Sequence, residues 1–147
     1  MYTHILIATD GSDLSEKAVQ HGLELARLCG ARVTALKIAP RYPSNYYEGA
    51  MTQAPDTIRS IESDWRAESQ KVADKVAARG AALQVPVAAL AEQSDFVGET
   101  IIEVIEREHC DLVVMASHGY RGLKRLLLGS ETQHVLTHAQ IPVLVLR

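Results

Sequence analysis

The chain has 147 residues, of which 47% are hydrophobic and 22% are charged, a composition that suits one globular domain with a single core. The formal net charge of -3 and the absence of an extended lysine or arginine run argue against a surface built to neutralise nucleic-acid phosphates. No apolar run approaches the ~20 residues that span a bilayer, and the N-terminus lacks the pattern of a signal peptide. We therefore expect one soluble, cytoplasmic domain over residues 1–147, with no nucleic-acid partner and no membrane span.

The first predicted strand covers residues 2–9, where an alternating pattern becomes continuously apolar before the turn formers of residues 10–12. Apolar residues then recur at helical spacing from Ser15. Gly30 follows the last of them and supplies the left-handed residue with which many helices end. The sequence thus predicts a strand, a tight turn and a helix in succession.

A second strand is predicted over residues 32–38, and a long loop over residues 39–49, which are rich in turn formers. The loop carries three tyrosines, for which a lid, a partner surface and simple packing on the next helix all remain open: Tyr42, Tyr46 and Tyr47. The following helix is predicted to begin after an N-cap at Asp56 and to end at Gly80.

The rest of the chain continues the alternation of strands and helices. Strands are predicted over residues 85–91, 111–116 and 142–146, and helices over residues 97–108 and 130–138. Strict alternation with nearly continuous apolar strands implies parallel neighbours joined by right-handed helical crossovers. The predicted fold class is α/β, a doubly wound five-stranded parallel sheet with helices on both faces.

In an open sheet of this kind, ligands bind beyond the carboxyl ends of the strands, where the strand order reverses. The loops after the first and fourth strands are therefore the candidate site, and Asp10 lies in the first of them. Its carboxylate can accept hydrogen bonds from a ribose or from the amides of its own helix. The sequence leaves both interpretations open.

The fourth strand is followed by Ser117-His118-Gly119, and the last helix opens with Gly129-Ser130. Glycine allows backbone amides to approach a polyphosphate closely, and a helix N-terminus attracts anions. The segment is neither a Walker P-loop nor a Gly-x-Gly-x-x-Gly fingerprint. Glycine spacing alone therefore leaves phosphate binding and an ordinary turn with an N-cap almost equally favoured.

Four segments, residues 10–12, 111–119, 126–130 and 141–145, together resemble the universal stress protein family, and the resemblance covers the whole chain. It implies an adenine nucleotide alpha hydrolase-like fold with strand order 3-2-1-4-5. The ATP-binding branch of that family is recognised by Gly-x-x-Gly, nine residues and Gly-Ser/Thr. Gly119, Gly129 and Ser130 stand at their places in this motif, whereas Ala116 replaces its first glycine.

The resemblance implies a binding site for ATP, with Mg2+ accompanying the nucleotide and coordinated largely by phosphate oxygens and water. The residues it places around adenine and ribose are Ala8, Thr9, Asp10, Ile38 and Met115, with Ala116 near the ribose. Those it places around the phosphates are Gly119, Gly129, Ser130, Glu131 and Thr132, while Ser117 and His118 line or order the same loop. The Ala116 methyl can crowd a close backbone contact near the ribose.

The last predicted strand, Pro142 to Leu146, is apolar and should lie at an edge of the sheet, where unpaired amides and carbonyls invite another strand. The resemblance implies a homodimer through this strand, and coverage by the chain's own loops is the alternative. The leading functional hypothesis is an ATP-dependent stress-response regulator. A nucleotide-free dimeric scaffold and a slow ATP hydrolase, with Glu131 the one carboxylate near the phosphates, are the alternatives.

Three other patterns favour structural interpretations. A hydrolase triad of Ser12 or Ser117 with His118 and Asp10 lacks a Gly-x-Ser-x-Gly elbow. His134 and His138 have the spacing of two metal ligands but no third one, so a solvated helix face is the better interpretation. The two cysteines, Cys29 and Cys110, are expected to be buried thiols.

Overall fold

The computed structural model describes residues 1–43, 53–119 and 128–147, and they form alternating strands and helices in the predicted order. The strands are β1 (His4–Ala8), β2 (Arg32–Ala39), β3 (Val87–Gln93), β4 (Leu112–Ala116) and β5 (Val143–Leu146). The helices are α1 (Asp13–Cys29), α2 (Pro55–Ala82), α3 (Val97–Glu108) and α4 (Ser130–His138). All neighbouring strands pair in parallel, in the order β3-β2-β1-β4-β5, so the predicted doubly wound sheet and its strand order are confirmed.

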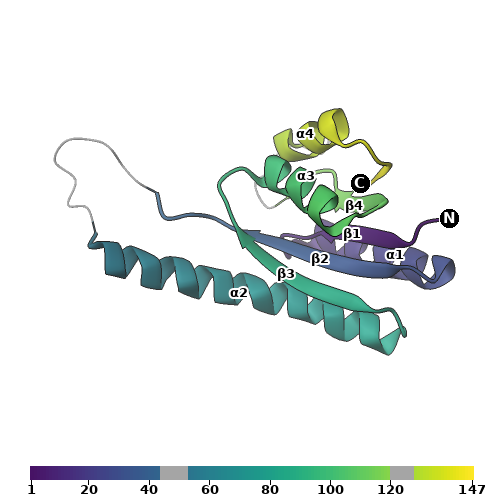
Figure 1. Ribbon diagram of the computed structural model, residues 1–147, viewed down its shortest axis with the longest axis horizontal. Helices are drawn as coiled ribbons and strands as arrows, with labels where there is room; N and C mark the ends of the chain where they lie inside the picture. Colours follow the sequence, from purple (N-terminus) through teal and green to yellow (C-terminus); the bar gives the residue numbers. More distant parts are fainter. Residues whose placement is uncertain (44–52, 120–127) are drawn as a thin grey trace.

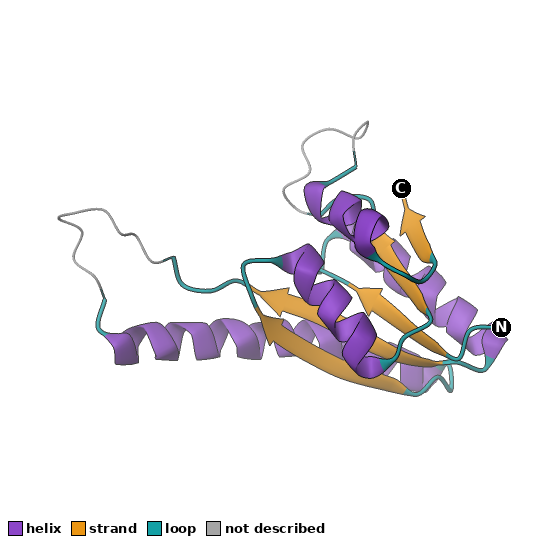
Figure 2. Cartoon of the chain, turned by 45° about the horizontal axis from the view of Figure 1, so that its top comes forward, coloured by secondary structure: helices purple, strands orange, loops and turns teal. Residues whose placement is uncertain are grey.

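Helices cover both faces of the sheet, α1 and α2 on one side and α3 and α4 on the other (Figures 1 and 2). Alternate residues of β1 serve the two cores, because successive side chains of a strand point to opposite faces. Ile5 and Ile7 pack with α1, whereas Leu6 packs with α3. The central strands are therefore buried on both faces, which explains their almost continuously apolar sequences.

Helix α1 ends before Gly30, as the sequence predicts, and begins at Asp13, two residues before the helical spacing of apolar residues starts at Ser15. The Ser12 hydroxyl caps it by accepting from the N–H of Ser15 at 3.3 Å. Gly30 ends it in the left-handed conformation, with φ of 67°, and directs its N–H at carbonyls of the last turn. Both ends are determined by local sequence.

Helix α2 differs from its prediction at both ends. Ala54 is the N-cap and Pro55 the first helical residue, so the prediction that Asp56 caps the helix is wrong, because proline is preorganised for that first position. The helix also continues past Gly80 to Ala82. Gly80 is buried against β3, where a side chain would overlap Val87, and it provides close packing in place of a helix end.

Strand β3 is shifted by two residues from the predicted 85–91, because a turn intervenes after α2. Gln84 adopts a left-handed φ of 58°, and the N–H of Val85 donates to the Gly80 carbonyl at 2.9 Å. Helix α2 buries side chains only from Ser69 onward, and its first part extends beyond the sheet (Figure 1). No helix in the described parts of the chain is both long and apolar enough to cross a membrane.

The tyrosine-rich loop is described only at its start, since residues 44–52, including Tyr46 and Tyr47, lie outside the described residues. Tyr42 stacks on Trp65 of α2, with ring centroids 6.2 Å apart. Its backbone N–H donates to the Glu62 carboxylate at 2.8 Å. Tyr42 therefore packs on the second helix, one of the alternatives that the sequence left open.

Candidate functional site

The carboxyl ends of β1 and β4 lie side by side at the centre of the sheet, and the two loops of interest leave from them. Thr9 follows β1 and keeps its hydroxyl inside the protein, 3.0 Å from the Ser15 hydroxyl. The same oxygen accepts from the N–H of Gly11 at 3.1 Å. Thr9 thus shapes the turn between β1 and α1 and contributes mainly its backbone to the surface of the site.

Asp10 connects the two loops. Its Oδ1 accepts from the N–H of Ser12 at 2.9 Å, so the carboxylate holds its own turn. Gly119, after β4, approaches the other carboxylate oxygen so closely that a side chain at this position would overlap it. With the two loops in this arrangement, a residue with a Cβ at position 119 would require the Asp10 carboxylate to move.

The loop after β4 is anchored at both of its ends. The N–H of Ser117 donates to the Leu146 carbonyl of β5 at 2.8 Å, and the Ser117 carbonyl accepts from the N–H of Gly129 at 2.8 Å. The Ser117 hydroxyl also lies 3.1 Å from Nδ1 of His118. Most of the nine-residue spacer of the motif, residues 120–127, lies outside the described residues. Its two flanks are nevertheless joined directly by the bond between Gly129 and Ser117.

Thr132 fastens the first turn of α4 to the end of β4. Its buried hydroxyl lies 3.0 Å from the Ala116 carbonyl and 3.2 Å from the Ser117 carbonyl and donates its hydrogen to these acceptors. The resemblance implied that Thr132 contacts phosphates. The structure shows its side chain fixing the helix N-terminus in place, which leaves the neighbouring backbone amides for a ligand.

The N-terminal turn of α4 faces the same edge of the sheet. Gly129 is its N-cap and provides no side-chain cap, and Ser130 is exposed. Glu131 points elsewhere: its Oε2 accepts from the N–H of Gly98 in α3 at 2.6 Å. The turn therefore has the free amide ends and positive dipole that attract an anion, while the one carboxylate on it is held by another helix.

Apolar residues line the neighbouring part of the site. Ala8 and Ile38 are half-buried at the ends of β1 and β2, and Met115 and Ala116 are buried at the end of β4. All thirteen residues that the sequence predicted for the site thus belong to, or directly follow, the carboxyl ends of β1, β2 and β4 or the start of α4.

Lys37 of β2 is a further residue at this edge, which sequence reasoning missed. Its Nζ donates to the Ile38 carbonyl at 3.0 Å. Burial lowers the pKa of the Lys37 ammonium below its ordinary value, and the Asp10 carboxylate acts in the opposite direction. A lysine between the apolar residues Leu36 and Ile38, near the carboxyl end of β2, was the signal that could have drawn attention to it.

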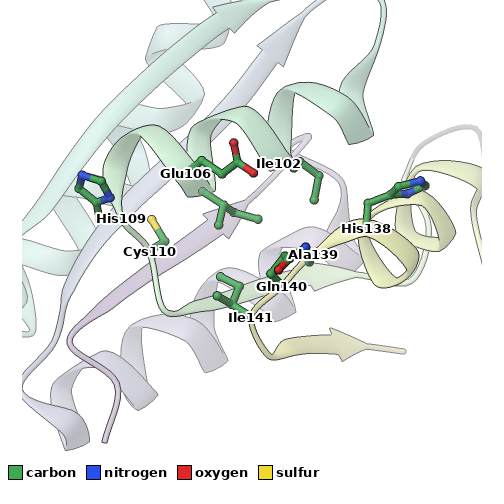
Figure 3. A pocket seen from close by; sticks show the side chains of 9 residues that line it. Ile102, Glu106, His109, Cys110, His138, Ala139, Gln140 and Ile141 are labelled. Atoms are coloured by element: carbon green, nitrogen blue, oxygen red, sulfur yellow. The ribbon is translucent and has the colours of Figure 1, made fainter.

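A hollow on the described surface lies at the opposite edge of the sheet, between the C-terminal ends of α3 and α4 (Figure 3). Its volume is about 310 Å³, and apolar residues such as Ile102 and Ile141 line much of it. The Cys110 thiol faces it, and burial raises the pKa of that thiol to about 12, so the sulfur is not a thiolate at neutral pH. Within the described residues, no group of three or more metal-ligating side chains occurs here or elsewhere.

The remaining alternatives raised by the sequence are also resolved in part. His134 and His138 stack with ring centroids 4.1 Å apart, and Nδ1 of His138 lies 2.8 Å from the His134 carbonyl. The two rings thus pack on each other along one face of α4. Cys110 is buried as expected, whereas Cys29 is only half-buried.

The fold defines a class of protein: doubly wound α/β domains, in which ligands generally bind beyond the carboxyl ends of the central strands. The model of the universal stress protein family matches residues 1–147, and the chain belongs to that family. Universal stress protein MJ0531 of Methanocaldococcus jannaschii is 32% identical over 148 residues, which covers 100% of this chain and 83% of the relative.

Solved structures show the same fold. UspA from Lactobacillus plantarum superimposes with a TM-score of 0.82 at 22% identity, covering 99% of this chain and 98% of that one. The universal stress protein from Archaeoglobus fulgidus in complex with dAMP gives a TM-score of 0.68 at 16% identity, covering 99% and 98% of the two chains. Family members of this architecture thus include one that holds an adenine nucleotide.

Proposed function

We propose that this chain is a universal stress protein that binds ATP at the carboxyl edge of β1, β2 and β4 and acts as a nucleotide-dependent regulator. The observation that supports this most directly is the uncapped N-terminal turn of α4, placed beside β4 by the bond between Gly129 and Ser117. The dAMP complex of the Archaeoglobus fulgidus protein supports adenine as the base. Residues 1–147 would serve as one domain in the cytoplasm.

The roles of the residues follow from their positions. Half-buried Ala8 and Ile38 offer apolar surface to adenine, and Asp10 offers a carboxylate to the ribose hydroxyls. The amides of Gly129 to Thr132 and the exposed Ser130 hydroxyl would receive the phosphates. Thr132 and Glu131 would contribute through their backbone, because their side chains already have partners.

Magnesium fits this donor set only as a companion of the nucleotide. The two carboxylates near the site, Asp10 and Glu131, each accept a backbone N–H, and no cluster of ligating side chains occurs within the described residues. The exposed Ser130 hydroxyl and the phosphate oxygens are further oxygen donors that could serve such an ion. When bound, the ion would neutralise part of the phosphate charge.

The proposal is tested by isothermal titration calorimetry with Mg-ATP, together with mass spectrometry of any nucleotide that co-purifies. Binding at micromolar to millimolar concentration supports it, and the absence of heat and of retained nucleotide contradicts it. Ser130→Ala should weaken ATP binding more than adenosine binding. Glu103→Gln, an exposed carboxylate of α3 remote from this edge, is the matched control.

A nucleotide-free dimeric scaffold is the second candidate, and buried Ala116 is the observation that favours it. If Ala116→Gly creates ATP binding where the parent has none, the scaffold is the correct function.

Strand β5 lies at the edge of the sheet with Leu144 38% exposed, so we propose it as the homodimer contact. A monomeric mass in light scattering would contradict the dimer. Any ATP hydrolysis should be slow, because the Glu131 carboxylate is held by α3.

A further inference from the structure

One carboxylate joins the N-termini of α3 and α4. Glu131 lies in the first turn of α4, and its Oε2 accepts from the N–H of Gly98, in the first turn of α3, at 2.6 Å. The α3 N-cap, Phe96, has no side chain that can cap the helix. Glu131 therefore supplies from another helix the acceptor that α3 lacks.

The packing between the two helices is arranged around this contact. A methyl group on Gly98 would lie 2.9 Å from Cβ of His134 and 3.0 Å from the Glu131 carboxylate. Glycine at this position thus allows α4 to approach α3 closely enough for the carboxylate to reach the amide. Gly98 is buried, so the hydrogen bond also satisfies a donor that has lost water.

Without this contact, the most favourable place for the Glu131 carboxylate would be its own helix. An acidic side chain in the first turn is attracted by the free amides and the positive end of the dipole. A carboxylate in that position would occupy the free amides of the turn, and its charge would repel the anion that the turn is proposed to bind. The bond to Gly98 directs the charge toward α3 instead.

We infer that Glu131 is a positioning residue that keeps the N-terminal turn of α4 available to an anion by tying its own carboxylate to Gly98. The inference rests on the proposed nucleotide site and specifies which side chain regulates it. It differs from a direct phosphate contact by the Glu131 side chain, because here the side chain acts by being held away. It also differs from a purely structural cap of α3, because the bond to Gly98 is inferred to keep the negative charge of Glu131 away from the phosphates.

Three substitutions separate these roles. Glu131→Gln retains an oxygen that can reach Gly98 and removes the charge. Glu131→Asp retains the charge on a side chain one methylene shorter, which cannot reach α3 and stays at the start of α4. Glu131→Ala removes both the acceptor and the charge. Glu103→Asp, an exposed carboxylate of α3, is the control for the shortened side chain.

The experiment measures the affinity of each variant for Mg-ATP and for adenosine by calorimetry, with the thermal midpoint and the amide shift of Gly98 recorded by NMR. We expect Glu131→Asp to bind Mg-ATP roughly threefold to tenfold more weakly than Glu131→Gln, with adenosine affinity unchanged. The NMR resonance of the Gly98 amide should move in Glu131→Asp and Glu131→Ala and stay near its parental position in Glu131→Gln. Glu131→Ala should lose stability yet bind Mg-ATP better than Glu131→Asp.

Equal Mg-ATP affinities for the Asp, Gln and Ala variants would overturn the inference while leaving the proposed function intact. Affinities that simply follow thermal stability, with Asp and Ala alike, would assign Glu131 a structural role only. If neither the parent nor any variant binds nucleotide, the proposed function fails, and the inference fails with it.

Discussion

The N–H of Gly129 donates to the carbonyl of Ser117 at 2.8 Å, and this one bond joins the start of α4 to the end of β4. The Thr132 hydroxyl reinforces the junction through the carbonyls of Ala116 and Ser117. The helix N-terminus is thus fixed beside the loop that follows the central strand. The candidate site depends on this junction, because a helix dipole acts only within about one turn of its end.

Gly119→Ala should weaken Mg-ATP binding by roughly tenfold, since its methyl group overlaps the Asp10 carboxylate and forces that carboxylate to move. Thermal stability should change little because Gly119 is exposed. Calorimetry and a thermal melt check the two effects. Gly30→Ala is the control with the opposite pattern: its left-handed φ of 67° makes alanine cost about 1 kcal/mol in stability, with no effect on nucleotide.

Thr132→Val should lower the free energy of unfolding by about 1–3 kcal/mol, because it removes the buried hydroxyl that donates to the ends of β4. Urea denaturation measures this change. Thr132→Ser keeps the hydroxyl and should retain more of the stability, apart from the loss of one methyl group. Equal losses in the two variants would show that packing, and not the hydrogen bond, is responsible.

The free energy of unfolding should fall as the pH drops below about 6.5, the ordinary His value, because of buried His4. Glu108 can only accept through its carbonyl, so Nδ1 of His4 carries the hydrogen and Nε2 accepts from the Thr34 hydroxyl. Burial and the nearby Arg32 cation lower the pKa of His4. The unfolded chain therefore binds the proton more readily than the folded one, and stability decreases on acidification.

Urea titrations at a series of pH values check this dependence on His4. The slope between pH 6.5 and the lower pKa of the folded protein should largely disappear in His4→Asn and persist in His21→Asn, an exposed histidine of α1. Asp111 contributes to the pH dependence of the free energy of unfolding in a separate, more acidic pH range. Partial burial raises its pKa, but hydrogen bonds from Thr3 and His4 outweigh this and hold the pKa below 3.8, so its contribution is lost only at more acidic pH.

Cys110 should resist alkylation by iodoacetamide at pH 8 in the folded protein and react once the chain is unfolded. Burial raises the pKa of its thiol to about 12, and the thiolate is the reactive form. Half-buried Cys29 should be modified first. Peptide mass spectrometry after timed labelling measures the order. Faster labelling of Cys110 than of Cys29 would show that the hollow between α3 and α4 opens readily.

The sequence by itself determined the features that depend on neighbouring residues. Apolar runs and turn formers predicted each strand and helix. Ser12 caps the start of α1 and Gly30 caps its end, each through its own local geometry. The motif residues Gly119, Gly129 and Ser130 were predicted at the edge of the sheet because parallel strands bring their carboxyl ends together. Periodicity and turn chemistry carry this information without any knowledge of the tertiary contacts.

Only the tertiary structure decided which partner each polar or small residue has. Gly80 was predicted to end α2, but it is a packing glycine against Val87, which lies on another element. Glu131 was placed at the phosphates, yet its carboxylate binds Gly98, 33 positions away. That Lys37 lies close enough to Asp10 for the carboxylate to act on its pKa is evident only in the folded protein. Such contacts join residues distant in the chain, and a one-dimensional pattern does not record where the packing of helices on the sheet will bring them together.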